Sequence, residues 1–134
     1  MRYKLVGTEK VRTVIADVAS ATEIAAGDLV GIASGLIVKA SETTERLAWT
    51  PSGSKNGETK MDVTVGNDFW LEGTGDAAFA VAHKGATVDV AAGASQEIDI
   101  GTTVTNVLRH DVSENAGTVG SVKGIRVKIE KPIF

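Results

Sequence analysis

The sequence has no cysteine, only two histidines and two prolines, and few aromatic residues, at 4% of the chain. Without cysteine, the protein has no disulfide framework, no thiolate nucleophile and no cysteine-ligated metal site. Two histidines, His83 and His110, are too few for a histidine-rich metal site. With so few aromatic side chains, Val, Ile, Leu and Ala must fill most of the core. The fold therefore depends on aliphatic packing.

Long hydrophobic runs are also lacking. No segment approaches the roughly 20 apolar residues that cross a bilayer, and the first residues lack the apolar centre of a signal peptide. We therefore expect synthesis in a cytoplasm and no membrane contact. The net charge is −3, and the fourteen basic residues are scattered along the chain instead of forming a stripe. Such a surface is a poor partner for nucleic acid.

Glycine is plentiful, with fifteen residues, and the apolar residues form short runs between glycine-rich turns. The clearest case is residues 24–40, where two apolar runs flank Ser34 and Gly35. This pattern predicts a β-hairpin, because its turn needs residues that tolerate positive φ. Asp28 is the single residue with a reactive side chain in this stretch. A hairpin this apolar needs cover from other strands.

Other segments predict strands as well. Residues 61–65 and 122–129 alternate between apolar and polar side chains, and the ranges 78–82, 87–91 and 104–112 are apolar enough to extend. Residues 50–60 and 113–121 predict polar loops, and residues 19–26 at most one helical turn. The predicted fold is mainly β: a small single-domain barrel or sandwich of short antiparallel strands, with at most one or two short helical turns.

The predicted domain organisation has two parts. Residues 1–10 form an extended N-terminal arm, and residues 11–134 form one β domain, because 134 residues suit a single domain. The first residues either pair with this domain or reach a neighbouring molecule, since Tyr3 and Leu5 need a sheet to cover them.

No pattern identifies a catalytic site. His83 is expected in an exposed turn, and adjacent strand positions direct His110 and Asp111 to opposite faces. Asp89, Glu97 and Asp99 fall at alternating strand positions and are expected to face water. Glycine pairs such as Gly73 and Gly75 lack the helix and lysine of a phosphate-binding loop. We therefore expect no enzymatic activity, no cofactor and no metal.

Large apolar side chains are the remaining candidates for a functional surface. These are Trp49, Phe69, Trp70 and Phe134. They belong either to the core or, where exposed, to a protein interface, because aromatic anchors dominate binding energy.

The order of these features resembles the capsid decoration, or cement, proteins of tailed bacteriophages. It comprises a short polar arm at residues 1–10, an extended segment, a turn with Ile24, Gly27 and Asp28, a hairpin ending at residues 38–40, and a closing Val-Lys-Ile strand. The resemblance implies a compact β domain without enzymatic activity. It also implies a position in the virion, on the outer capsid surface, as a homotrimer that clamps neighbouring major capsid protein subunits.

The resemblance further implies that Tyr3, Leu5 and Val6 of the N-terminal arm form the clamp, by adding a strand to a sheet edge of the capsid protein. Two alternatives stay open. The chain is another phage structural subunit, from the tail tube or head completion, or it is a carbohydrate- or ligand-binding β module in which Trp49 or Trp70 stacks on a sugar. An enzyme would require His83 or His110 beside a carboxylate in a pocket.

Overall fold

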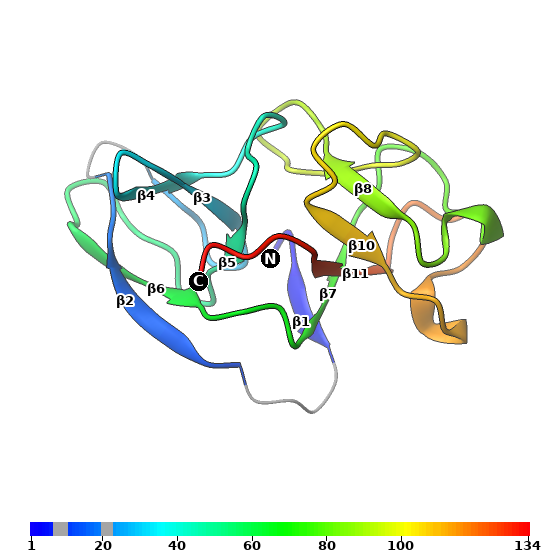
Figure 1. Cartoon of the computed structure of the whole chain (residues 1–134), viewed down its shortest axis with the longest axis horizontal. Helices are drawn as coiled ribbons and strands as arrows, with labels where there is room; N and C mark the ends of the chain where they lie inside the picture. Colours follow the sequence, from blue (N-terminus) through cyan, green and yellow to red (C-terminus); the bar gives the residue numbers. More distant parts are fainter. Residues whose placement is uncertain (7–10, 20–22) are drawn as a thin grey trace.

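The computed structural model describes residues 1–6, 11–19 and 23–134. Within these residues the chain forms eleven short strands and two single-turn 3-10 helices (Figure 1). In chain order they are β1 (Lys4–Val6), β2 (Thr13–Asp17), β3 (Leu29–Ala33), β4 (Leu36–Lys39), β5 (Ala48–Trp49), β6 (Lys60–Thr64), β7 (Trp70–Gly73), η1 (Val81–His83), β8 (Thr87–Val90), β9 (Ile98–Asp99), β10 (Leu108–His110), η2 (Glu114–Ala116) and β11 (Ile125–Ile129). The predicted mainly β fold of short antiparallel strands is confirmed.

A six-stranded antiparallel sheet has the order β1-β7-β11-β10-β8-β9. Its central strand β11 alternates as the sequence predicts: Ile125, Val127 and Ile129 are buried, and the residues between them are half-buried. Gly75, just beyond β7, forms an isolated bridge with Ile98 of β9. This bridge brings the far edge of the sheet next to the chain that leaves β7.

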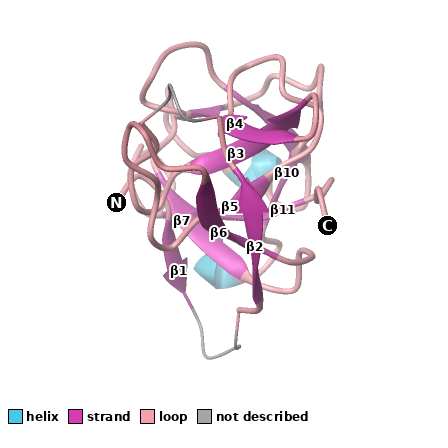
Figure 2. Cartoon of the chain, turned by 90° about the vertical axis from the view of Figure 1, so that its left-hand side faces the viewer, coloured by secondary structure: helices cyan, strands magenta, loops and turns pink. Residues whose placement is uncertain are grey.

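The other strands form two smaller sheets, β4-β3-β5 and β2-β6. The predicted hairpin of β3 and β4 is confirmed, with Ala33 opposite Leu36. Ser34 and Gly35 connect these strands with φ values of 51° and 80°. Two successive positive φ values are typical of a type I′ turn, whose twist matches that of the paired strands. β2 and β6 lie at the same end of the molecule as the hairpin, and Figure 2 views the structure from this end.

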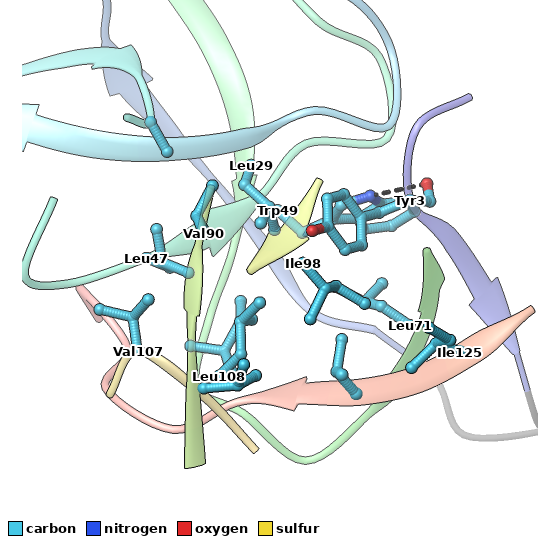
Figure 3. Close-up of a cluster of buried hydrophobic side chains, with 14 of the residues drawn as sticks. Tyr3, Leu29, Leu47, Trp49, Leu71, Val90, Ile98, Val107, Leu108 and Ile125 are labelled. Atoms are coloured by element: carbon cyan, nitrogen blue, oxygen red, sulfur yellow. Dashed lines mark hydrogen bonds between the residues drawn. The ribbon is translucent and has the colours of Figure 1, made fainter. Parts of the chain in front are cut away.

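The six-stranded sheet and the β3–β5 region share one hydrophobic core. In the larger hydrophobic cluster, Leu29, Leu47 and Trp49 from the β3–β5 region pack with residues of the six-stranded sheet such as Leu71 and Leu108 (Figure 3). A smaller cluster lies between β2-β6 and the hairpin; its members are Val18, Ile24, Val30, Ile37, Ala48, Met61 and Val63. Packing across the sheets therefore ties the described parts of residues 11–134 together.

Several sequence predictions differ from the structure. Residues 78–82, predicted as a strand, lead into η1, because the Ala80 N–H group donates a hydrogen bond to Nδ1 of His83 and starts a tight turn. The range 104–112 is a strand only at β10. Of the predicted turn at 19–26, residues 20–22 lie outside the described part of the chain.

Asp89 is also placed differently. It was expected to face water, but it is 4% exposed. Its carboxylate accepts hydrogen bonds from the backbone N–H groups of Val104, Thr105 and Asn106. Burial raises the pKa of this carboxyl, but the hydrogen bonds from the three N–H groups lower it by a larger amount. The pKa therefore lies below its usual value. Asp89 therefore anchors the loop before β10.

Candidate functional site

Tyr3, a predicted contact residue, lies in the core. It is 1% exposed, and its hydroxyl donates a hydrogen bond to the Gln96 carbonyl at 2.7 Å. A Cβ atom at Gly73 would come within 2.5 Å of the Tyr3 ring, so glycine at 73 makes room for it. Burial, and secondarily Glu97, raises the pKa of the Tyr3 phenol. The prediction that Tyr3 contacts a partner from a free arm is therefore wrong.

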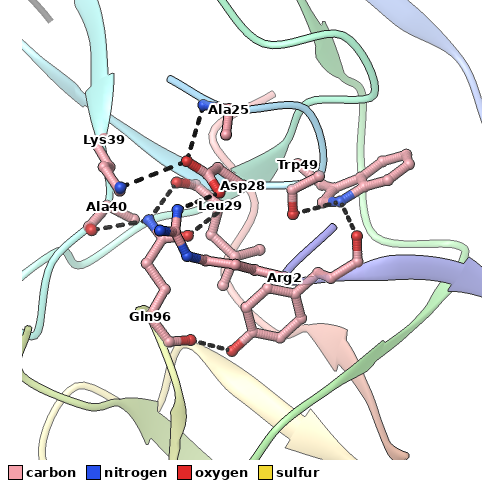
Figure 4. A network of polar contacts seen from close by, with 10 residues as sticks. Arg2, Ala25, Asp28, Leu29, Lys39, Ala40, Trp49 and Gln96 are labelled. Carbon is pink, nitrogen blue, oxygen red and sulfur yellow. Dashed lines mark hydrogen bonds and ion pairs between the residues drawn. The ribbon is translucent and has the colours of Figure 1, made fainter. Parts of the chain in front are cut away.

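Trp49 and Phe69 are buried as well, each 4% exposed. The indole Nε1 of Trp49 donates hydrogen bonds to the carbonyls of Tyr3 and Gly27, both at 3.1 Å (Figure 4). Both aromatic residues belong to the larger hydrophobic cluster. The alternative that they belong to the core is confirmed, and their prediction as interface residues is wrong.

Leu5 and Val6 lie on β1, the edge strand of the six-stranded sheet, and Trp70 lies on the neighbouring strand β7. Leu5 pairs with Leu71 and Val6 with Trp70, and all three candidate side chains are half-buried. The Nζ atom of Lys128 lies 5.5 Å from the centre of the Trp70 ring. Residues 4–6 of the predicted arm are thus part of the sheet, and residues 7–10 lie outside the described part of the chain. These half-buried side chains have only part of their surface left for a partner.

Phe134 is the remaining predicted contact residue, and its side chain is exposed. It is 44% exposed, and its carbonyl accepts a hydrogen bond from the Gly66 N–H group. The predicted contact residues therefore do not form one surface: three lie in the core, three along the β1–β7 edge, and Phe134 by the end of β6.

A buried polar network holds the N-terminal residues in place (Figure 4). The Asp28 carboxylate, completely buried, accepts a hydrogen bond from Nη1 of Arg2 at 2.8 Å and lies 3.6 Å from Nζ of Lys39. The Gln96 side chain bonds the N–H and carbonyl groups of Leu29 and the carbonyl of Ala40. Because the Asp28 carboxylate is buried, its ion pair with Arg2 makes the first residues an integral part of the fold.

Among the described residues, the outer side of β2 is paired only just after the strand, where Val18 forms an isolated parallel bridge with Ile37 of β4 and the Ala19 N–H group donates to the Ile37 carbonyl. The Arg12 carbonyl accepts from the Val65 N–H group, and the Val18 N–H group donates to the Thr59 carbonyl. The backbone N–H and carbonyl groups of successive residues point to opposite sides of a strand. In β2, those of the even-numbered residues therefore point toward β6, and those of Thr13 and Ile15 point away from it. No backbone partner for the outward groups of Thr13 and Ile15 is found among the described residues.

The side chains along this edge are unusually apolar for exposed positions. Ile15 is 74% exposed and Val14 38%. Ile15 also lines an open groove of about 490 Å³, together with Ile24 and Met61. At the end of the strand, Asp17 forms an ion pair with Lys60. An exposed edge with apolar side chains is a template for strand addition. We therefore take the β2 edge as the candidate functional site.

Few features of the sequence point to this site. The β-branched residues of this segment, such as Val14 and Ile15, predict extended structure, but nothing in them tells an edge strand from a central one. Gln96 was also missed. It has a φ value of 51°, and the signal that could have drawn attention to it is a large polar residue just after the small residues of 91–95.

The two histidines do not form a catalytic pair with an acid in the described part of the chain. His83 accepts a hydrogen bond from the Ala80 N–H group, and the ring nitrogens of His110 have no partner. Groups of three or more residues able to hold a metal ion are likewise not found among the described residues. In the same residues, no helix is both long and apolar enough to cross a membrane.

No protein-family model matches the chain, and no curated protein or solved structure matches it either.

Proposed function

We propose that the chain is a structural protein of a bacteriophage particle that binds the outer capsid surface and clamps neighbouring major capsid protein subunits. The proposal combines the order of sequence features with one structural observation: the outward backbone groups of Thr13 and Ile15 in β2 have no backbone partner among the described residues. In this proposal β2 replaces the N-terminal arm as the contact element, because Arg2 and Tyr3 are fastened into the fold. The protein is then a virion component made in the host cytoplasm.

The contact would be an added β-strand. The N–H and carbonyl groups of Thr13 and Ile15 offer four main-chain hydrogen-bonding positions on the outer side of β2, and each hydrogen bond contributes about 0.5–1.5 kcal/mol net. Burial of the exposed part of Ile15 adds about 1–2 kcal/mol. A single contact of this size is weak once the cost of association is included. On a symmetric lattice, and in a homotrimer, several such contacts act together and become strong.

The carbohydrate-binding alternative receives no support from the tryptophans. Trp49 is buried, and its Nε1 atom bonds inside the protein. Trp70 is half-buried beside Lys128. Trp49 presents no open ring face, and the hollow that Trp70 lines with Asn67 and Asp68 has a volume of only about 60 Å³, which is small for a sugar stacked on the ring. The strand edge at β2 is the better candidate surface.

The test is sedimentation of the purified protein with expanded capsid shells, comparing wild type with Ile15→Pro. Proline at position 15 removes an N–H group that points away from β6, so the pairing of β2 with β6 remains. We expect Ile15→Pro to stay folded and to lose at least tenfold in binding. Ile32→Ser, at an exposed apolar position on the hairpin, is the matched surface control and should bind like wild type.

A second control separates folding from binding. Val14→Pro removes an N–H group that faces β6 and should lower the thermal stability of the domain. If folded Ile15→Pro binds shells as tightly as wild type, the β2 edge is not the contact. Binding of wild type to isolated tail tubes, and not to shells, would contradict the capsid assignment and favour another phage structural role.

A further inference from the structure

The only two histidines of the sequence meet at one end of the six-stranded sheet. His83 comes from η1 and His110 from β10, and their rings stack with centres 5.8 Å apart and planes inclined by 25°. Phe79 packs against both, with ring centres 5.8 Å from His83 and 5.6 Å from His110. The three rings join a turn and a strand that are distant in sequence.

His110 is suited only to the neutral state in this position. It is 1% exposed, and neither ring nitrogen has a hydrogen-bond partner in the described structure. An imidazolium here would be a buried charge without compensation. Burial, with a smaller contribution from the neighbouring His83, lowers the pKa of His110 to about 4.

His83 fixes the start of η1. Its Nδ1 atom accepts a hydrogen bond from the Ala80 N–H group at 2.9 Å. Because its ring also stacks on His110, the start of η1 is joined to the buried imidazole. A change at His110 therefore reaches η1 through this stack.

Among the described residues, no acidic side chain is placed to offset a proton on His110. The charged residues that flank the pair are Lys84 after η1, Arg109 and Asp111 around His110, Glu114 in η2, and Arg126 and Lys128 on β11. Strand alternation places Arg109 and Lys128, which pair across β10 and β11, on the opposite face from His110. Asp111 pairs with Arg126, and Glu114 is exposed.

Phe79 links the histidine pair to the loop at 111–121. Its N–H group donates to the Ser121 carbonyl, and its carbonyl accepts from the Gly120 N–H group. Its ring also lies against Gly117, where an added Cβ atom would approach it to 3.3 Å. Movement of the rings therefore affects residues 79–86 and the 111–121 loop together.

We propose that His83, His110 and Phe79 form a proton-operated latch. While His110 is neutral, the three packed rings hold η1 and the 111–121 loop against the end of the six-stranded sheet. Protonation of His110 releases both segments and exposes Phe79, while the β2–β6 pair and the hairpin stay folded. This latch is independent of the role proposed for the β2 edge.

The direction and size of the effect follow from linkage. An opened His110 has the ordinary pKa of 6.5, above its pKa of about 4 in the closed state, so the opened state binds more protons between these values. Opening is therefore unchanged above about pH 6.5, increases as the pH falls from 6.5 to 4, and levels off below. Between pH 7.5 and pH 5.0 the opening equilibrium should rise about 30-fold.

Amide hydrogen exchange at pH 7.5 and 5.0, corrected for intrinsic exchange rates, tests the latch. We expect the opening equilibrium at the Phe79, His83 and His110 amides to rise by the 30-fold factor. The amide of Val63, which lies in the β2–β6 pair, should change less than threefold. An equal change at both places would mean global unfolding and would overturn the latch.

Variants identify the group that takes up the proton. His110→Phe keeps a buried ring that cannot titrate, and we expect it to lose the pH response. His83→Gln keeps an acceptor for the Ala80 N–H group and leaves His110 in place, so we expect it to keep the response. A response that persists in His110→Phe contradicts the proposal. Should His110→Phe fail to fold, an NMR titration of wild-type His110 decides: titration below pH 5 supports the latch, and titration near 6.5 overturns it.

Discussion

The position of Tyr3 leads to a quantitative prediction, because it decides whether the first residues are an arm or a part of the fold. Tyr3→Ala removes a ring that is 1% exposed and leaves the Gln96 carbonyl without its hydrogen-bond donor. Truncation of a buried aromatic side chain to alanine costs about 4 kcal/mol, and the lost hydroxyl bond about 1 kcal/mol. The total of about 5 kcal/mol is comparable to the whole stability of a small domain.

Urea unfolding followed by tryptophan fluorescence measures this loss, because the indole of Trp49 bonds the Tyr3 carbonyl. Tyr3→Phe keeps the ring and should lose only about 1 kcal/mol. Lys4→Ala, at the next and exposed position, should change the free energy of unfolding by less than about 0.5 kcal/mol. If Tyr3→Ala costs no more than Lys4→Ala, residues 1–6 are a free arm and the structural argument fails.

Two further variants test buried polar groups. Gln96→Leu leaves the N–H and carbonyl of Leu29 and the carbonyl of Ala40 unpaired, so urea unfolding should show a loss of about 3 kcal/mol; a loss under 1 kcal/mol would contradict the network. Asp89→Asn should lose about 1–2 kcal/mol at pH 7, because an amide nitrogen would face backbone donors. The pKa of Asp89 is lowered in the folded protein, so its stabilisation is present above about pH 4 and is lost as the pH falls through the folded-state pKa. The difference in thermal stability between wild type and Asp89→Asn should therefore shrink as the pH falls below about 4; a constant difference would refute this.

The strands with clear alternation could be predicted from the sequence. β11 buries every second residue, as its pattern indicates, whereas its pairing with strands on both sides was not predicted. The hairpin of β3 and β4 follows from the turn residues Ser34 and Gly35, whose positive φ values are a local property. In both cases a few neighbouring residues determine the structure.

The parts that the sequence did not predict depend on contacts between distant residues. Tyr3 is buried because Gly73 leaves room for its ring and Gln96 offers a carbonyl to its hydroxyl. Asp89 is buried because a loop 15 to 17 residues away supplies three N–H donors. Neither partner is visible from local periodicity or composition. The β2 edge is of the same kind, since its exposure depends on which strands pair with it.

The central claim is that β2 binds the partner through its outer edge. The most direct measurement is hydrogen exchange at the Thr13 and Ile15 amides, with and without bound capsid shells. We predict that both amides gain protection on binding, while the Val14 amide, which faces β6, changes little. Unchanged exchange at Thr13 and Ile15 in shell-bound protein would contradict the claim.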